Sequence, residues 1–297
     1  MILQNLIIHT LVFMLRTSDF QLLTSRFRLP TSSFPLPASD FRLLTSVFQL
    51  PASSFINILQ LILLAALLLY ALYYVYESFF GKTYQPRLWK KAVKNKEIPE
   101  DLRRAEAKYK DSIRFFSWWF QVERLKKQEV SGDFAELGVY KGDSAEVLHL
   151  MDKSRVFHLF DTFSGFQDED LKTETGKAAG YTPLHFADTS VEQVRKRLQA
   201  EKFIFHPGNF SKTKNQVAEK QFALVNMDVD LYLPTREGLA FFYPRLLAGG
   251  VIFVHDYNPD WPGIVKAVDE FCNEFKVTPI HIPDTDDTVV IVKTNQS

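Results

Sequence analysis

Residues 135–147 read AELGVYKGDSAEV, an apolar run that reaches two glycines and then continues in a helical pattern. The run before Gly138 is typical of a buried strand, and residues 144–151 are typical of a helix. Gly138 and Gly142 allow a tight turn, and the free amides at the start of the helix can bind a carboxylate or a nucleotide there. A plain turn that binds nothing is the alternative. The stretch predicts a strand, a ligand-binding turn and a helix.

The same order of strand and helix recurs over residues 99–297. This alternation predicts a mainly parallel, doubly wound, Rossmann-like sheet that is covered by helices on both faces. The last two strands follow one another without a helix, which predicts an antiparallel hairpin at one edge. We therefore expect the α/β fold of the class I methyltransferases, with seven strands. The predicted strands are 133–139, 156–161, 203–208, 222–230, 249–256, 277–283 and 288–294, and the predicted helices are 99–128, 144–151, 190–199, 235–247 and 263–275.

The first two strand ends carry candidate cofactor-binding residues, because ligands of open sheets bind beyond the carboxyl ends of the strands. Glu136 precedes the turn of Gly138 and Gly142, and the third glycine of the dinucleotide pattern is missing. An acidic residue there can neutralise the amino or sulfonium charge of S-adenosylmethionine, so the turn favours this cofactor over NAD. Asp161 ends the second strand, nineteen residues after Gly142, where its carboxylate can accept both ribose hydroxyls.

The third strand ends in FHPGNF, residues 205–210. Asn209 is placed to read the adenine edge, and Phe210 is placed to stack on the base. A loop turn at Pro207 and Gly208 is the alternative.

The fourth and fifth strand ends carry candidate catalytic and metal-binding residues. Asp228 follows one strand, and His255 and Asp256 follow the next. Carboxylates at neighbouring strand ends converge over the sheet, where they can bind Mg²⁺ and lower the pKa of a substrate hydroxyl. His255 is a candidate metal ligand or general base, or else a structural residue. Asp230 is interpreted as a cap of the turn or of the next helix.

Five motifs together resemble the macrocin O-methyltransferase (TylF) family over residues 98–297. The resemblance implies an S-adenosylmethionine-dependent, Mg²⁺-dependent O-methyltransferase whose relatives modify sugar hydroxyls of natural products. It matches Asp228 and Asp256 to metal-binding positions, and it departs from the family at His255, where the family often has a second acidic residue. It also matches Glu136, Gly138, Gly142 and Asp161 to the cofactor site. The motifs are GDFAELGVYKGDSA (132–145), FDTFSGF (160–166), FADTSVEQVRKRL (186–198), MDVDLYLPTREGLAFFYPRLLAGGVIFVHDY (227–257) and PGIVKAVDEF (262–271).

Residues 56–76 carry no charged side chain and are long enough to cross a bilayer as one helix. Tyrosines gather at the carboxyl end of this stretch, where aromatic rings favour the water interface, and a basic linker follows at residues 77–98. The apolar stretch predicts that the protein is anchored to a membrane. The basic residues after it predict that the catalytic domain lies in the cytoplasm. A core helix of a soluble domain is the alternative.

Residues 1–55 are of low complexity and contain a seven-residue repeat, which runs from TSDFQLL (17–23) to ASSF (52–55). The spacing of its Phe and Leu residues forms no coiled-coil stripe, and its prolines interrupt any helix. We expect disorder. A tandem DNA repeat read from an upstream start codon is the other interpretation, in which case the protein begins near the membrane segment, or is cytoplasmic if the whole segment is not expressed.

The charge balance gives no reason to expect a nucleic-acid partner, because 35 basic residues stand against 35 acidic ones. The expected acceptor is a sugar-containing small molecule or, given the membrane helix, a lipid-linked glycan. A non-catalytic S-adenosylmethionine-binding module and an NAD-dependent oxidoreductase are the alternatives. The sequence leaves open whether the protein forms a homo-oligomer.

Overall fold

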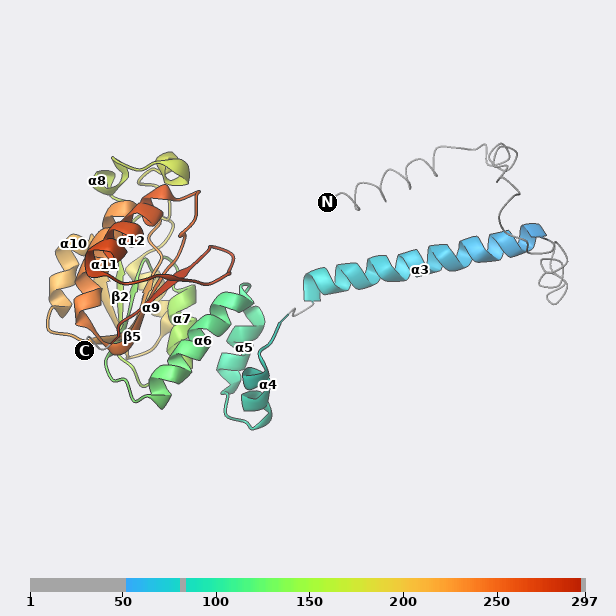
Figure 1. Cartoon of the computed structure of the whole chain (residues 1–297), viewed down its shortest axis with the longest axis horizontal. Coiled ribbons are helices and arrows are strands. Elements are labelled where there is room, and N and C mark those ends of the chain that lie inside the picture. Colours follow the sequence, from blue (N-terminus) through green and yellow to red (C-terminus); the bar gives the residue numbers. More distant parts are fainter. Residues whose placement is uncertain (1–51, 81–83, 295–297) are drawn as a thin grey trace. The chain divides into compact units, whose positions relative to one another are not determined.

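The computed structural model describes residues 52–80 and 84–294 (Figure 1). The chain divides into two compact units, Met1–Lys82 and Thr83–Ser297, which are described separately. Every buried hydrophobic residue of the described chain lies between Trp89 and Ile291. The second unit therefore carries a hydrophobic core of its own.

Helix α3 (Ala52–Phe80) is the described part of the first unit. Its stretch Ile56–Tyr76 is apolar enough and long enough to cross a membrane, and none of it is buried. At a rise of 1.5 Å per residue this stretch is about 31 Å long, similar to the hydrocarbon core of a bilayer. The predicted helix over residues 56–76 is therefore confirmed as a helix, and membrane crossing stays a prediction. The repeat, up to residue 51, lies outside the described residues.

The second unit is built on one seven-stranded sheet in the order β3-β2-β1-β4-β5-β7-β6. Strands β1 to β5 are parallel, whereas β7 lies antiparallel between β5 and β6. The predicted seven strands, the parallel sheet and the antiparallel hairpin at its edge are confirmed. The strands are β1 (Asp133–Leu137), β2 (Phe157–Asp161), β3 (Phe203–Pro207), β4 (Phe222–Met227), β5 (Leu246–Val254), β6 (Ile280–His281) and β7 (Val289–Val292).

Helices cover both faces of the sheet because its strands are apolar on both sides (Figure 1). In β5, Val251 and Phe253 pack with α6 (Ser112–Lys127) and α7 (Asp143–Met151). Ile252 and Val254 point the other way and pack with α11 (Tyr232–Arg245) and α12 (Pro262–Phe275). The remaining helices are α8 (Asp168–Leu171), η1 (Gly176–Gly180), α9 (Val191–Leu198), α10 (Phe210–Thr213) and η2 (Lys214–Val217).

The region before the sheet differs from the sequence prediction in two ways. The single helix predicted over residues 99–128 is two helices, α5 (Glu100–Lys108) and α6, because the side chain of Asp111 caps a new helix by accepting from the Arg114 amide at 2.9 Å. Part of the predicted basic linker 77–98 is also helical, as α4 (Arg87–Lys94). Trp89 of α4 is 1% exposed, so the folded domain begins before Pro99.

Gly138 is required by the close approach of β1 and β4 at their carboxyl ends. Its φ is +88°, and a Cβ atom added there would lie 1.8 Å from the carbonyl oxygen of Asp228. We expect Gly138→Ala to lower the free energy of unfolding by on the order of 3 kcal/mol, because the left-handed backbone and the clash both oppose a side chain. Urea unfolding of residues 83–297 measures this.

The matched control is Gly180→Ala, since Gly180 is exposed and a Cβ atom there would meet nothing within 4 Å. This change should alter the free energy of unfolding by less than about 0.5 kcal/mol. Equal effects of the two substitutions would contradict the role assigned to Gly138.

Candidate active site

A cavity of about 710 Å³ opens at the carboxyl ends of the parallel strands. It lies where the strand order reverses between β1 and β4, the position at which open α/β sheets bind ligands. Its volume is within the range of small-molecule sites. Its walls come from the turns after β1, β2, β3, β4 and β5 and from residues 162–186.

The turns that surround the cavity run through left-handed backbone at residues other than glycine. The φ angles are +49° at Tyr140 after β1, +60° at Asp230 after β4 and +62° at Asp256 after β5. Such conformations cost on the order of 1 kcal/mol or more for residues with a side chain, and they cluster at functional sites. All three residues line the cavity.

Asp161 organises the turn after β1. One of its carboxylate oxygens accepts from the backbone amides of Val139 at 2.7 Å and Tyr140 at 2.8 Å, and the other accepts from the amide of Phe163 at 2.6 Å. Asp161 lines the cavity as predicted. Its carboxylate therefore links the turns after β1 and β2. Binding of the cofactor ribose by Asp161 stays a prediction.

Gly138, Gly142, Asn209 and Phe210 also line the cavity or border its turn. Gly142 has a φ of +83° and precedes α7 as its N-cap residue. Asn209 caps α10 by accepting from the Ser211 amide at 2.9 Å, and its amide group donates to Asp170 at 3.1 Å. Phe210 is 5% exposed and packs edge-to-face on Phe160 at 5.3 Å. The ring of Phe210 is thus held in the wall of the cavity by core packing, and stacking of a base on it stays a prediction.

Three carboxylates meet over the ends of β4 and β5. Ligand atoms of Asp228, Asp230 and Asp256 all lie within 4.8 Å of one another. The interpretation of Asp230 as a cap is wrong, because α11 has Leu231 at its N-cap position and no side-chain cap. We refer to Asp228, Asp230 and Asp256 as the carboxylate triad.

The triad has the electrostatics of a cation site. Burial is the main cause that raises the pKa of Asp228 to about 6, of Asp230 to about 7 and of Asp256 to about 9, and neighbouring carboxylates add to each shift. Carboxylates held this close resist ionising together, and a bound cation would relieve their repulsion. Hard oxygen ligands in this number fit Mg²⁺ or a similar divalent ion, completed by water or substrate.

Arg114 of α6 is the positive charge beside the triad. Its Nε donates to Asp284 at 2.9 Å, and its terminal nitrogen forms an ion pair with Asp286. Its charge acts to lower the pKa of Asp228, against the effect of burial. Arg114 and Asp286 both line the cavity. Sequence reasoning missed them because Arg114 lies on a helix before the first strand and Asp286 lies in the loop between the last two strands, whereas the search considered the carboxyl ends of the parallel strands.

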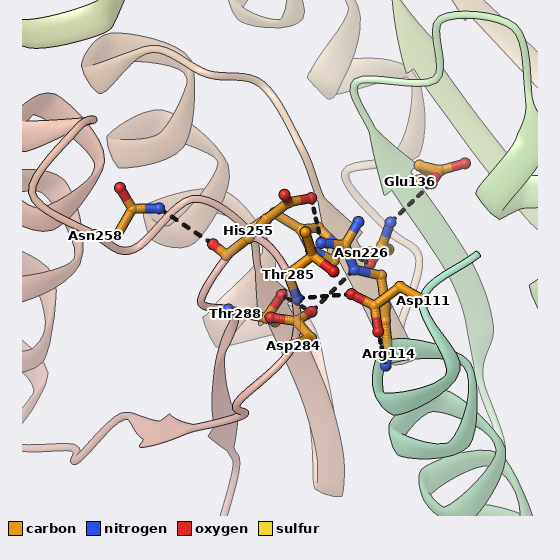
Figure 2. A network of polar contacts seen from close by, with 10 residues as sticks. Asp111, Arg114, Glu136, Asn226, His255, Asn258, Asp284, Thr285 and Thr288 are labelled. Atoms are coloured by element: carbon orange, nitrogen blue, oxygen red, sulfur yellow. Dashed lines mark hydrogen bonds and ion pairs between the residues drawn. The ribbon is translucent and has the colours of Figure 1, made fainter. Parts of the chain in front are cut away.

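Glu136 and His255 do not line the cavity; they lie beneath it in a row of buried polar side chains (Figure 2). Asn226 donates to Glu136 at 2.8 Å, and its oxygen lies 2.7 Å from Nε2 of His255. Nδ1 of His255 lies 2.8 Å from the hydroxyl of Thr288, which donates to Asp284 at 2.5 Å. We refer to these five side chains as the buried polar row.

The buried polar row corrects two predictions. Glu136 is fully buried, so it is not placed to neutralise a cofactor charge in the cavity. His255 is 2% exposed and both its ring nitrogens have partners, so it is neither a metal ligand nor a general base in this structure. The row extends from β1 across β4 and β5 to the residues before β7 because alternate side chains of neighbouring strands share one face of a sheet.

Residues 162–188 bring aromatic side chains to the rim of the cavity. Tyr181 stacks on Phe166 at 5.2 Å, and both line the cavity with Trp261. Burial raises the pKa of Tyr181 to about 12, and the charge of Asp230 adds to the shift. The segment is held to the start of α11, where a Glu174 oxygen accepts from the Tyr232 amide at 2.7 Å.

The buried Glu136 makes stability depend on pH. Burial raises the pKa of Glu136 to about 8, above the value near 4.5 of the unfolded chain. Between these values the folded protein keeps the proton and the unfolded chain loses it, so the free energy of unfolding falls as the pH rises. Relative to Glu136→Gln, which mimics the protonated acid, we expect the wild type to lose up to about 4 kcal/mol between pH 5 and pH 8.

Urea unfolding of both proteins at several pH values measures this difference. The exposed Glu219 supplies the control, since Glu219→Gln should leave the pH dependence of the wild type unchanged. A difference between wild type and Glu136→Gln that stays constant across the pH range would contradict the buried, protonated state of Glu136.

Comparison with known proteins extends these observations. Two curated relatives are similar to the chain. It is 31% identical over 168 residues to demethyldecarbamoylnovobiocin O-methyltransferase of Streptomyces niveus, a match that covers 52% of this chain and 64% of that enzyme. It is 27% identical over 153 residues to 8-demethyl-8-(2,3-dimethoxy-alpha-L-rhamnosyl)-tetracenomycin-C 4'-O-methyltransferase of Streptomyces olivaceus, covering 47% of this chain and 58% of that enzyme. The chain thus spans less than two thirds of the length of either relative.

A solved structure and a family pattern agree with these two matches. The solved structure of the O-methyltransferase NovP superposes with a TM-score of 0.54 at 26% identity, covering 62% of this chain and 81% of that one. The pattern of the family described as Macrocin-O-methyltransferase (TylF) matches residues 111–293, which is more than half of the chain. The match includes the carboxylate triad, the buried polar row and every residue that lines the cavity except Tyr109. This protein belongs to the macrocin O-methyltransferase (TylF) family.

Proposed function

We propose that the protein transfers the methyl group of S-adenosylmethionine to a hydroxyl of a sugar or glycan-type acceptor, with a divalent cation at the carboxylate triad. The observation that carries the proposal is the convergence of Asp228, Asp230 and Asp256 within 4.8 Å, at the edge of a cavity where this fold binds ligands. Membership of an O-methyltransferase family supports the reaction type.

The turn after β1 and the end of β2 form the cofactor side of the cavity. Gly138 and Tyr140 expose backbone there, and Asp161 fixes the turn through two amides. The third glycine of a dinucleotide site is missing from residues 138–142. This arrangement favours S-adenosylmethionine over NAD.

The triad supplies the chemistry of the acceptor side. When bound, a divalent ion would lower the pKa of an acceptor hydroxyl and orient it. Asp228 and Asp256 would hold the ion, and Asp230, whose carboxylate lies within 4.8 Å of both, is placed to accept the hydroxyl proton. The hydroxyl oxygen forms the new bond to the methyl carbon as the carbon–sulfur bond breaks, leaving S-adenosylhomocysteine.

A sugar acceptor is supported by the rim and by the relatives. The rings of Phe166, Tyr181 and Trp261 surround the opening beside the triad, and aromatic rings pack well on the apolar faces of sugars. The name of one relative specifies a methylated rhamnosyl group.

Calorimetry with S-adenosylmethionine tests the cofactor. A protein of residues 83–297 should bind S-adenosylmethionine with a dissociation constant in the micromolar range, and NAD should not compete, because the cavity lacks a pyrophosphate turn. Competition by NAD would favour the oxidoreductase alternative. Binding without methyl transfer to any sugar acceptor would favour the non-catalytic module.

The same protein tests the metal. Asp228→Asn and Asp256→Asn should each weaken Mg²⁺ or Mn²⁺ binding at least ten-fold in calorimetry, because each removes a charged ligand. Asp168→Asn is the control, since Asp168 is outside the cavity. Full cation binding by the two triad variants would overturn the metal site.

We also propose that α3 anchors the protein in a membrane with the catalytic domain in the cytoplasm, and that a lipid-linked glycan is the acceptor. The apolar stretch Ile56–Tyr76 and the basic residues after it support the anchor and its orientation. The full chain should sediment with membranes, resist extraction by high salt and be released by detergent. A wholly soluble full-length protein would contradict the anchor, and it would leave the methyltransferase proposal standing.

A further inference from the structure

Helix α4 and the residues after it present five cations to solvent. Arg87, Lys90, Lys91, Lys94 and Lys96 are all exposed, and residues 84–96 contain no acidic side chain. We call these five residues the basic face. A charge run of this density produces a local positive potential although the whole chain is neutral.

The basic face is fixed to the catalytic domain. Trp89, on the opposite side of α4, is inserted among aromatic rings of α6, with ring centres 5.5 Å from Phe115, 5.5 Å from Phe116 and 5.2 Å from Trp119. Pro86 precedes the helix and is itself buried. The cations are therefore displayed on a rigid helix, and whatever binds them also orients the domain.

The cations of the basic face have no ion-pair partner among residues 84–294. Some other cations of the domain do pair with carboxylates, as Arg197 does with Glu146 at 2.9 Å and Arg236 with Glu274. Within residues 84–294, no ion pair therefore compensates the positive charge of the basic face.

Two apolar side chains lie within the same surface. Tyr84 and Leu88 are each 60% exposed beside the cations. Cations next to exposed apolar and aromatic side chains are the composition of a helix that lies on a lipid surface, with the apolar groups in the head-group region. A soluble anion would contact only the cations, whereas a lipid surface would also bury the exposed Leu88.

Few residues separate the basic face from α3 along the chain. Seven residue steps lead from Phe80, the last residue of α3, to Arg87, the first residue of α4. Seven residues span at most about 25 Å even when fully extended. The basic residues are therefore juxtamembrane in the sequence if α3 crosses a bilayer.

We propose that the basic face of α4 binds anionic phospholipid head groups and holds the catalytic domain against the membrane surface. Juxtamembrane basic residues near an anionic leaflet each contribute on the order of a five-fold gain in binding. Because the basic face belongs to the folded domain, its binding to lipid can be measured without α3 and independently of catalysis.

Vesicle sedimentation of residues 83–297, which carry their own core, tests the proposal. The protein should bind vesicles of phosphatidylcholine with about one third phosphatidylserine, and pure phosphatidylcholine at least ten-fold more weakly. Lys90→Gln, Lys91→Gln and Lys94→Gln combined should weaken binding to the anionic vesicles by roughly a hundred-fold. Raising the salt from about 0.1 to 0.5 M should also release the wild type.

The matched control removes three exposed lysines from other surfaces, Lys127→Gln, Lys196→Gln and Lys202→Gln. It should change binding less than about three-fold, and both triple variants should keep the thermal midpoint and the S-adenosylmethionine affinity of the wild type. Equal losses in the two triple variants would overturn the proposal, because net charge alone would explain them. Tighter binding to single-stranded RNA than to anionic vesicles would overturn it in favour of a nucleic-acid surface.

Discussion

The mutual repulsion of three carboxylates at one edge of the sheet is the constraint on which the rest of the site depends. Asp228, Asp230 and Asp256 converge although burial and their own charges oppose ionisation of all three. The scaffold holds them there at a cost in backbone strain, since Asp230 and Asp256 both occupy left-handed conformations. Arg114, which pairs with Asp284 and Asp286, offsets part of the charge because its guanidinium also attracts the carboxylates of Asp228 and Asp256. A divalent cation would offset the remainder, so the same geometry that is unfavourable in the free protein becomes the source of cation affinity.

Much of the fold could be predicted from the sequence because the strands of a doubly wound sheet are short, apolar on both faces and separated by helices. The parallel sheet, its antiparallel edge and the position of the cavity at the strand ends follow from that pattern of elements, whereas the spatial order of the strands is known only from the structure. The region before β1 was less predictable. Residues 99–128 carry a continuous helical pattern, yet Asp111 starts a new helix there. The basic residues around Trp89 suggest a linker, and it is the tertiary contact of that single indole with α6 that makes them part of the domain.

Of the candidate site, only the residues that lie at strand ends could be predicted from the sequence. Gly138, Asp161, Asp228 and Asp256 line the cavity as their positions at strand ends predict. The direction of a side chain is harder to predict, because neighbouring residues of a strand point to opposite faces and the last residues leave the pleat in irregular turns. Glu136 is one residue before the end of β1 and points to the α6 face, into the core. Glu136 is therefore fully buried although the next residue, Leu137, lines the cavity.

His255 is a second residue whose role is decided by the alternation of side chains along a strand. It is the next residue after β5 and continues the row of Glu136 and Asn226, so its ring is captured by Asn226 and Thr288 beneath the site. The following residue, Asp256, turns through a left-handed conformation and returns its carboxylate to the cavity. Asp230 supplies the third carboxylate from β4. Histidine at position 255 therefore leaves three carboxylates together, Asp228, Asp230 and Asp256. Its ring supports the start of the loop that carries Asp256 through its contacts with Asn226 and Thr288, and burial lowers the pKa of the ring well below its usual value. The oxygen donors that a hard cation needs come from the ends of β4 and β5, where Asp230 joins the two carboxylates that the motif identifies.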